Sequence, residues 1–253
     1  MSGIATQAGM LRGGTGGQIV TSSLVLHLDA GDSNSYSGSG TTWTDLSSTG
    51  DDFTLINSPT FSSSNGGEIQ FDKNNDKAQI VGSTAIKSMA SEGTIQFWFR
   101  TLNQTIGAGA WTRLISFSNN LTSNNDYNAY LCVTKSGSVE KSNFWYKGGT
   151  PASPNASYPL LNDDNYHNIA YTWRTSGSSM IFNSYLNGVN VKTGTTTQSA
   201  YSSTNADVIT IAARNNGGNN ADCSISVVTM YDAELSASEV QQNFNAHKVR
   251  HGI

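Results

Sequence analysis

The chain has 253 residues, of which 36% are hydrophobic and only 13% are charged, and its formal net charge at pH 7 is −4. A chain of this length can bury a substantial core and is expected to form one large β-domain or two small ones. The charge balance and the lack of a basic cluster argue against nucleic-acid binding, and no apolar run is long enough for membrane insertion as a spanning helix.

The N-terminal segment is rich in glycine and has few apolar side chains to pack. Such a segment is typical of a flexible tail, so we divide the chain into an N-terminal arm, residues 1–22, and one domain, residues 23–253. The arm also lacks the apolar core of a secretion signal. Without export, the Asn-x-Ser/Thr triplets at Asn103, Asn120 and Asn155 predict no glycosylation.

The first half of the domain alternates short apolar runs with polar loops. The clearest strand is expected at residues 93–100, where Ile95, Phe97 and Phe99 share one face because successive strand residues point to opposite sides. Further strands are expected at residues 24–28, 53–56, 67–71, 78–81, 111–117, 127–134 and 143–147.

Residues 165–194 predict a meander of three antiparallel strands. Ile169, Tyr171 and Trp173 alternate with polar or small residues, which is the period of a half-buried strand. Asn187–Gly188 tolerates the positive φ angles of a type I′ hairpin turn. A meander with one polar face must pack its other face against a partner, which the remaining strands supply.

The end of the chain predicts one helix. Ser236 followed by Glu239 forms a capping box, and Leu235 and Val240 are spaced for a hydrophobic staple across the first turn. Gly252 can end the helix. Two further strands are expected at residues 208–212 and 224–231. About a dozen short strands with one short helix indicate an all-β antiparallel sandwich.

Three motifs together carry a family resemblance. They are Gly93–Arg100, the pair Tyr166–Trp173 and Tyr185–Val189, and Ile225–Val240. They resemble strands of the concanavalin A-like lectin/glucanase sandwiches, in particular the laminin G-like (LamG) branch. The resemblance covers residues 24–250 and implies a concanavalin A-like jelly roll with a short C-terminal helix.

Two residues depart from the pattern of this family. Cys223 stands where the family often has glycine, and Tyr166 stands where it often has tryptophan. With only two cysteines in the chain, Cys132 and Cys223 are expected to be buried free thiols, and a disulfide between them is the alternative.

A narrower resemblance concerns residues 24–31, together with Ser35–Tyr36, Gly40–Trp43, Asp45–Ser47 and Gly66–Gly67. This combination is similar to a subset of these domains that is frequent in virion structural proteins of tailed phages. It implies a virion protein assembled in the host cytoplasm without a signal peptide. We expect a capsid-decorating or appendage subunit, forming a homo-oligomer, whose N-terminal arm binds other virion proteins.

The alternative is a carbohydrate-binding adhesion module that recognises host-surface glycans, for example on a tail or head fibre. Glycan binding needs aromatic side chains beside amides at a loop rim. Tyr127, Trp145, Tyr146 and Tyr158 neighbour Asn-rich loops and are the glycan-binding candidates. The competing interpretation is that each packs within a strand.

Catalysis is not expected. The related glucanases place paired acids in a Glu-x-Asp-x-x-Glu arrangement, where they serve as nucleophile and general acid. None of the glutamates of this chain has that spacing; they are Glu68, Glu92, Glu140, Glu234 and Glu239. The chain also lacks a His-Glu-x-x-His metal motif and a nucleophile elbow. We therefore predict a non-enzymatic protein with no catalytic residue and no required cofactor.

The four histidines have ordinary explanations. His27 and His167 fall in expected strands and are predicted to make structural hydrogen bonds, whereas His247 and His251 fall near the helix end, where solvated cations are favoured.

Calcium is a further expectation that the resemblance carries, because LamG domains often hold this ion at one rim. The matching positions are Asp126, Asn215 and Asn216, whose oxygen atoms lie in expected loops. The alternative is that all three are turn residues.

Overall fold

The computed structural model describes residues 17–85, 89, 91–101, 111–118, 127–136, 139–146, 156–158, 161, 163–196, 208–214 and 218–253. In the strands between residues 111 and 158, it describes the side chains of residues 113–118, 131 and 133.

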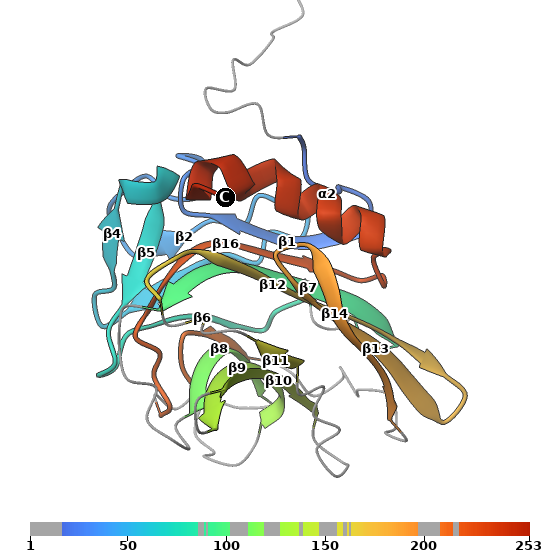
Figure 1. Cartoon of the computed structure of the whole chain (residues 1–253). Helices are drawn as coiled ribbons and strands as arrows, with labels where there is room; N and C mark the ends of the chain where they lie inside the picture. The colour runs from blue at the N-terminus through green and yellow to red at the C-terminus, as the bar shows by residue number, and fades with distance from the viewer. Residues whose placement is uncertain are drawn as a thin grey trace, which may run out of the picture.

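Two antiparallel sheets lie one above the other and enclose the main core (Figure 1). The first sheet has the spatial order β14 (Val189–Thr196), β13 (Ser179–Leu186), β12 (His167–Ser176), β7 (Glu92–Thr101), β16 (Cys223–Tyr231), β5 (Glu68–Phe71) and β4 (Thr60–Ser62), and β1 (Leu24–Asp29) also pairs with β16. The second has the order β11 (Ala156–Tyr158), β10 (Val139–Tyr146), β9 (Tyr127–Ser136), β8 (Trp111–Ser118), β15 (Val208–Ile211), β6 (Lys77–Val81), β3 (Phe53–Ile56) and β2 (Thr42–Trp43). The described strands therefore form the all-β sandwich that the sequence predicts.

The core between the sheets confirms the predicted inward face of β7. Ile95, Phe97 and Phe99 have no exposed surface (0% each), and they pack with Trp43 and Phe53 from the second sheet. Burying a side chain of this size stabilises the fold by about 2 kcal/mol relative to leaving it exposed.

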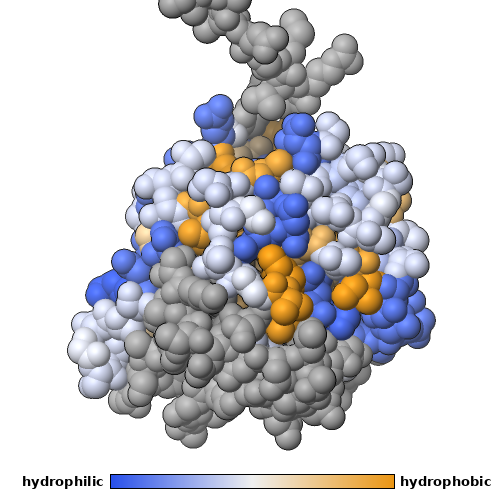
Figure 2. Space-filling model, turned by 180° about the vertical axis from the view of Figure 1, so that it is seen from behind, coloured by the Kyte–Doolittle hydropathy of each residue, from blue (hydrophilic) through white to orange (hydrophobic). Residues whose placement is uncertain are grey.

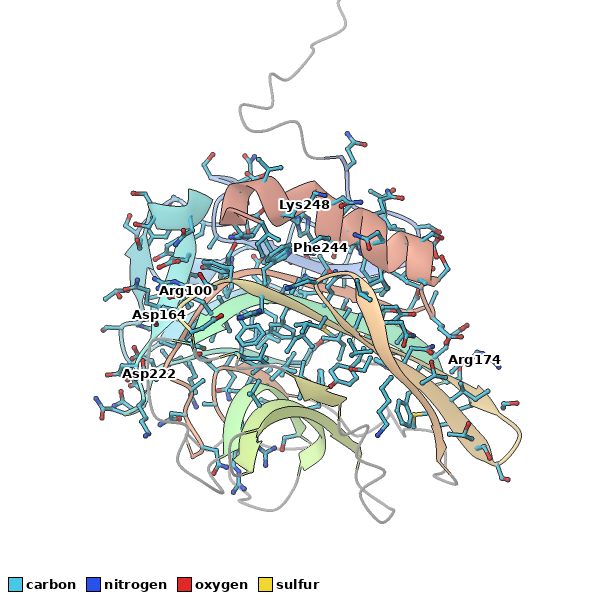
Figure 3. All side chains as sticks on the ribbon, in the orientation of Figure 1. Arg100, Asp164, Arg174, Asp222, Phe244 and Lys248 are labelled. Atoms are coloured by element: carbon cyan, nitrogen blue, oxygen red, sulfur yellow. The ribbon has the colours of Figure 1, made fainter. Side chains whose placement is uncertain are left out.

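A helix covers the outer face of the first sheet (Figure 1). This layer consists of α2 (Ala237–His247) and the 3₁₀ turn η3 (Lys248–His251). Trp98 of β7 points outward and stacks on Phe244, with ring centroids 5.4 Å apart. Phe244 reaches from α2 toward the sheet (Figure 3). This second, smaller core explains why both faces of β7 are buried.

The start of α2 has the predicted capping box. The Glu239 amide donates to Ser236 Oγ, and the Ser236 amide donates to Glu239 Oε2 at 2.8 Å. Leu235 and Val240 belong to one buried cluster, as a hydrophobic staple requires. Gly252, at φ 75°, terminates η3.

The predicted meander is confirmed as β12, β13 and β14. Asn187 and Gly188 join β13 to β14 with φ angles of 50° and 78°, as a type I′ turn needs. The strands β2, β4 and β11 were not predicted, and β10 begins four residues before its predicted start. The missed strands are two or three residues long and too short to show a period.

Residues 17–22, the end of the predicted arm, lie against α2. The Val20 amide donates to Asn243 Oδ1 at 2.8 Å, and the Val20 carbonyl accepts a bond from the Tyr231 hydroxyl at 3.1 Å. The Gln242 side chain donates through Nε2 to the Gln18 carbonyl at 3.0 Å. Residues 1–16 of the arm lie outside the described residues.

Cys223 is a buried free thiol, as expected. Burial, reinforced by the charge of Asp222, raises the pKa of this thiol. Because Cys223 is unpaired, the alternative disulfide with Cys132 is excluded.

No helix within the described residues has the length and apolar character needed to cross a membrane. On the face of the molecule drawn in Figure 2, the hydrophobic residues form separate patches between hydrophilic ones. The described residues of this face therefore show no broad apolar contact surface.

Candidate functional site

A pocket of about 560 Å³ opens at one edge of the sandwich. It lies where the chain passes from β3 in the second sheet to β4, the edge strand of the first sheet. The lining residues are Tyr36, Gly38, Ser39, Gly40, Thr41, Leu55, Asn57, Ser58, Pro59, Thr60 and Phe61. We call this the edge pocket.

Two aromatic rings form one wall of the edge pocket. Tyr36 is buried (5% exposed) and its ring centroid lies 5.5 Å from that of the half-buried Phe61. The Tyr36 hydroxyl donates to the Gly40 carbonyl at 2.9 Å, which closes the loop before β2. Burial raises the pKa of Tyr36, so the phenol stays protonated at neutral pH. Aromatic surface of this kind suits the apolar face of a sugar ring.

The loops of the edge pocket have unusual backbone conformations. Asn57 and Ser58 have φ angles of 68° and 74°, in the left-handed region that non-glycine residues rarely adopt. The Asn57 side chain donates through Nδ2 to the Asn75 carbonyl at 2.7 Å and helps hold this conformation. Gly38 also has positive φ, and a Cβ there would lie 3.4 Å from the Phe61 ring. Strain of this kind is common at binding sites.

The rest of the edge pocket is uncharged and combines hydroxyl and amide groups with the apolar Leu55 and Pro59. Hydroxyl groups come from Ser39, Thr41, Ser58 and Thr60, and none of the lining residues carries a charge at neutral pH. The pocket can therefore donate and accept hydrogen bonds and offer aromatic surface, which suits a neutral ligand with many hydroxyl groups. It holds no carboxylate for acid–base catalysis.

Glu68 is a carboxylate that lies outside the edge pocket and makes several hydrogen bonds. Glu68 has no exposed surface (0%) and accepts hydrogen bonds from Arg100 Nη2 at 2.7 Å and from the Tyr166 hydroxyl at 2.7 Å. Burial alone would raise the pKa of Glu68, but its hydrogen bonds outweigh this effect and lower the pKa to about 2. Arg100, which is labelled in Figure 3, reaches this carboxylate from β7. Glu68 is therefore an ionised structural group and a poor proton donor.

The burial of His251 differs from the expectation of a solvated cation near the helix end. His251 is buried (8% exposed), stacks on Tyr166 with ring centroids 4.2 Å apart, and contacts Ser226 Oγ through Nε2 at 3.2 Å. Burial lowers the pKa of His251 to about 3. The prediction of a solvated cation is wrong here because η3 turns this residue onto the sheet. His167 makes the predicted structural contact, with Asp163 at 3.0 Å.

The calcium candidates Asp126, Asn215 and Asn216 lie outside the described residues. Calcium binding by them therefore stays a prediction.

The glycan candidates from the sequence lie in described strands, but their side chains are not described. The strand register places Tyr127, Trp145 and Tyr146 near one end of the β9–β10 pair, where Tyr146 is opposite Ala129. Tyr158 pairs with Glu140, toward the other end of β10. The topology thus separates Tyr158 from the other three.

The sequence analysis did not identify the edge pocket. Its aromatic pair is contributed by a Gly/Ser-rich loop and by the three-residue strand β4. The one available signal was the Ser35–Tyr36 pair within the glycine-rich loop.

The fold defines a lectin-like β-sandwich. A profile of the concanavalin A-like lectin/glucanases superfamily matches residues 72–241, and the chain belongs to this superfamily. The edge pocket precedes the matched range, so the family match does not account for it. No curated protein matches the sequence.

Binding domains of clostridial toxins are among the solved structures with a similar fold. The binding domain of paraclostridial mosquitocidal protein 1 superposes with a TM-score of 0.64 at 17% identity, over 88% of this chain and 52% of the other. The botulinum neurotoxin serotype G binding domain superposes with a TM-score of 0.63 at 17% identity, over 87% of this chain and 50% of the other. The botulinum neurotoxin DC binding domain, solved in complex with SialylT, superposes with a TM-score of 0.62 at 14% identity, over 88% of this chain and 51% of the other. The chain thus spans about half of each structure, and the likeness is one of fold.

Proposed function

We propose that this protein is a non-enzymatic carbohydrate-binding module whose ligand occupies the edge pocket. The observation that carries the proposal is the composition of this pocket, in which the rings of Tyr36 and Phe61 stand beside hydroxyl and amide groups without any charge. Such a lining matches the alternating apolar and hydroxylated faces of a saccharide. The toxin binding domains support the proposal by fold, and one of them was solved in complex with SialylT.

A glycan array read with the full chain tests this function. We expect saturable binding to a subset of glycans. A parallel array with EDTA separates the edge pocket from a calcium-dependent site at Asp126, Asn215 and Asn216. Binding that survives EDTA favours the edge pocket, whereas its loss would assign recognition to the calcium candidates. No binding across a broad array would reject the glycan-binding function.

A pair of tryptophan variants assigns binding to the edge pocket. Ser39→Trp places a large ring among the lining residues, and Ser33→Trp places the same ring at an exposed position of the same loop, outside the lining. We expect Ser39→Trp to weaken binding at least about tenfold and Ser33→Trp to leave it unchanged. Equal binding by both variants would contradict this location.

A virion structural role is the second candidate, and it is compatible with glycan binding. Gln18 and Val20 lie beside α2, so a partner held through residues 1–22 would be placed next to this helix. Deleting residues 1–22 should abolish incorporation into particles while the sandwich still folds. Incorporation of the truncated chain would contradict anchoring by this arm.

A further inference from the structure

A cluster of titratable side chains lies between the outer face of the first sheet and the helical layer. His27 and Asp29 come from β1, and His247 is the last residue of α2. One ligand atom from each residue lies within 4.8 Å of the ligand atoms of the other two. From this geometry we propose that His27, Asp29 and His247 form a binding site for a divalent transition-metal ion, with Zn²⁺ as the best fit.

The first support is a pair of unsatisfied imidazole nitrogens. Nε2 of His27 and Nε2 of His247 are both buried, and neither has a hydrogen-bond partner within the described part of the chain. A buried polar atom without a hydrogen-bond partner destabilises the fold. An ion placed between the two rings would satisfy both nitrogens at once.

The two rings offer the ligand type that such an ion prefers. An imidazole nitrogen with a free lone pair is the commonest protein ligand of transition-metal ions.

Asp29 can supply the third ligand while it keeps its ion pair. Oδ1 accepts bonds from the Gly31 amide at 2.8 Å and from Arg250 Nη2 at 2.8 Å, whereas Oδ2 accepts one bond, from Arg250 Nη1 at 3.0 Å. A carboxylate oxygen has two lone pairs, so Oδ2 retains one that can bind a metal ion. Arg250 would then orient the ligating carboxylate, a common arrangement around protein metal sites.

The local charge favours a cation despite the presence of Arg250. The carboxylates of Asp29, Asp45 and Asp32 all act electrostatically on His27, and Arg250 is the one cation that opposes them there. A divalent ion between the histidines would therefore enter a region of net negative charge.

The ligand chemistry selects the ion. Two imidazole nitrogens with one carboxylate suit zinc, copper or nickel, whereas calcium and magnesium prefer oxygen ligands throughout. Ligand atoms around a tetrahedral zinc stand about 3.3 Å apart, because each bond is about 2.0–2.1 Å long. Separations of up to 4.8 Å would therefore have to shorten by as much as about 1.5 Å, which side-chain rotation can provide, and a water would complete the tetrahedron.

Calorimetric titration of the EDTA-treated full chain with Zn²⁺ tests the proposal. We expect one bound ion per chain, and at least about tenfold weaker binding for His27→Gln and for His247→Gln. The matched control is His167→Gln, because His167 lies outside the cluster and contacts Asp163. Absence of saturable binding, or equal affinity in all three variants, would overturn the proposal.

A second measurement covers the case in which a variant fails to fold. Each of the four histidines gives its own imidazole signals in NMR spectra of the wild-type chain. Paramagnetic Ni²⁺ should broaden the His27 and His247 signals first and leave His167 sharp. Broadening that begins at His167, or that is uniform across all four histidines, would show that the ions bind adventitiously at the surface. That result would contradict the site.

Discussion

Glu68 shows how a fully buried carboxylate can stabilise a fold without serving in catalysis. Besides Arg100 and Tyr166, it accepts bonds from Gln70 Nε2 at 2.8 Å and Asn65 Nδ2 at 3.1 Å. These donors connect β5, β7 and the segment before β12. Removing the charge would leave the Arg100 guanidinium without its partner beneath the helical layer.

We predict that Glu68→Gln lowers the free energy of unfolding at pH 7 by about 3 kcal/mol. The folded-state pKa of Glu68, about 2, lies below its ordinary value of 4.5. Its contribution is therefore complete above pH 4.5 and disappears as the pH falls from 4.5 to 2. Urea unfolding across this range should show the two proteins converging. Parallel curves, or an equal loss in the exposed control Glu92→Gln, would refute this explanation.

His251 makes a separate contribution at higher pH. Because burial lowers its folded-state pKa from 6.5 to about 3, the unfolded chain binds a proton that the folded protein excludes. Stability should therefore be complete above pH 6.5 and decrease as the pH falls toward 3. His251→Phe keeps an aromatic ring against Tyr166. In urea unfolding, this variant should lose about 2–4 kcal/mol less of its free energy of unfolding than the wild type does between pH 6.5 and 3. An unchanged slope would show that His251 is protonated in the folded protein.

At the scale of elements, Asn243 connects α2 to two other parts of the molecule. Its Nδ2 donates to Gln96 Oε1 at 3.1 Å and to the Tyr231 hydroxyl at 3.0 Å, while its Oδ1 accepts the bond from the Val20 amide. The helix, the first sheet and the N-terminal segment thus share one buried side chain.

We predict that Asn243→Ala destabilises the fold by about 2–3 kcal/mol, because buried polar partners lose their bonds. Hydrogen exchange of the Val20 amide should accelerate markedly, since Asn243 holds that proton. Asn245→Ala, on the same helix, is the control and should leave the exchange rate unchanged. An equally slow Val20 amide in Asn243→Ala would contradict this account.

Elements with strong local signals could be predicted from the sequence. The alternation in β7, the Asn187–Gly188 turn and the capping box of Ser236 each act over a few residues, and each was confirmed. The short strand β4 has no such signal, because its pairing with β5 is set by the tertiary fold. The burial of His251 was not predicted, because the packing of α2 and η3 on the first sheet depends on residues far apart in the sequence.

At the scale of the whole molecule, both sites depend on contacts between distant segments. The edge pocket forms where β3 of the second sheet leads into β4, the edge strand of the first sheet, so Tyr36 and Phe61 come together only after the sandwich has closed. The histidine cluster joins the first strand to the last helix. Neither constellation has a characteristic spacing in the sequence, which is why motif analysis found neither.

The central claim, that the edge pocket binds a glycan, is tested most directly by amide NMR of the full chain during titration with the strongest ligand from the array. The account predicts saturable shifts of amides in residues 38–41 and 57–61, and their loss in Ser39→Trp. Shifts confined to β9, β10 and β11, or shifts that persist in Ser39→Trp, would contradict it.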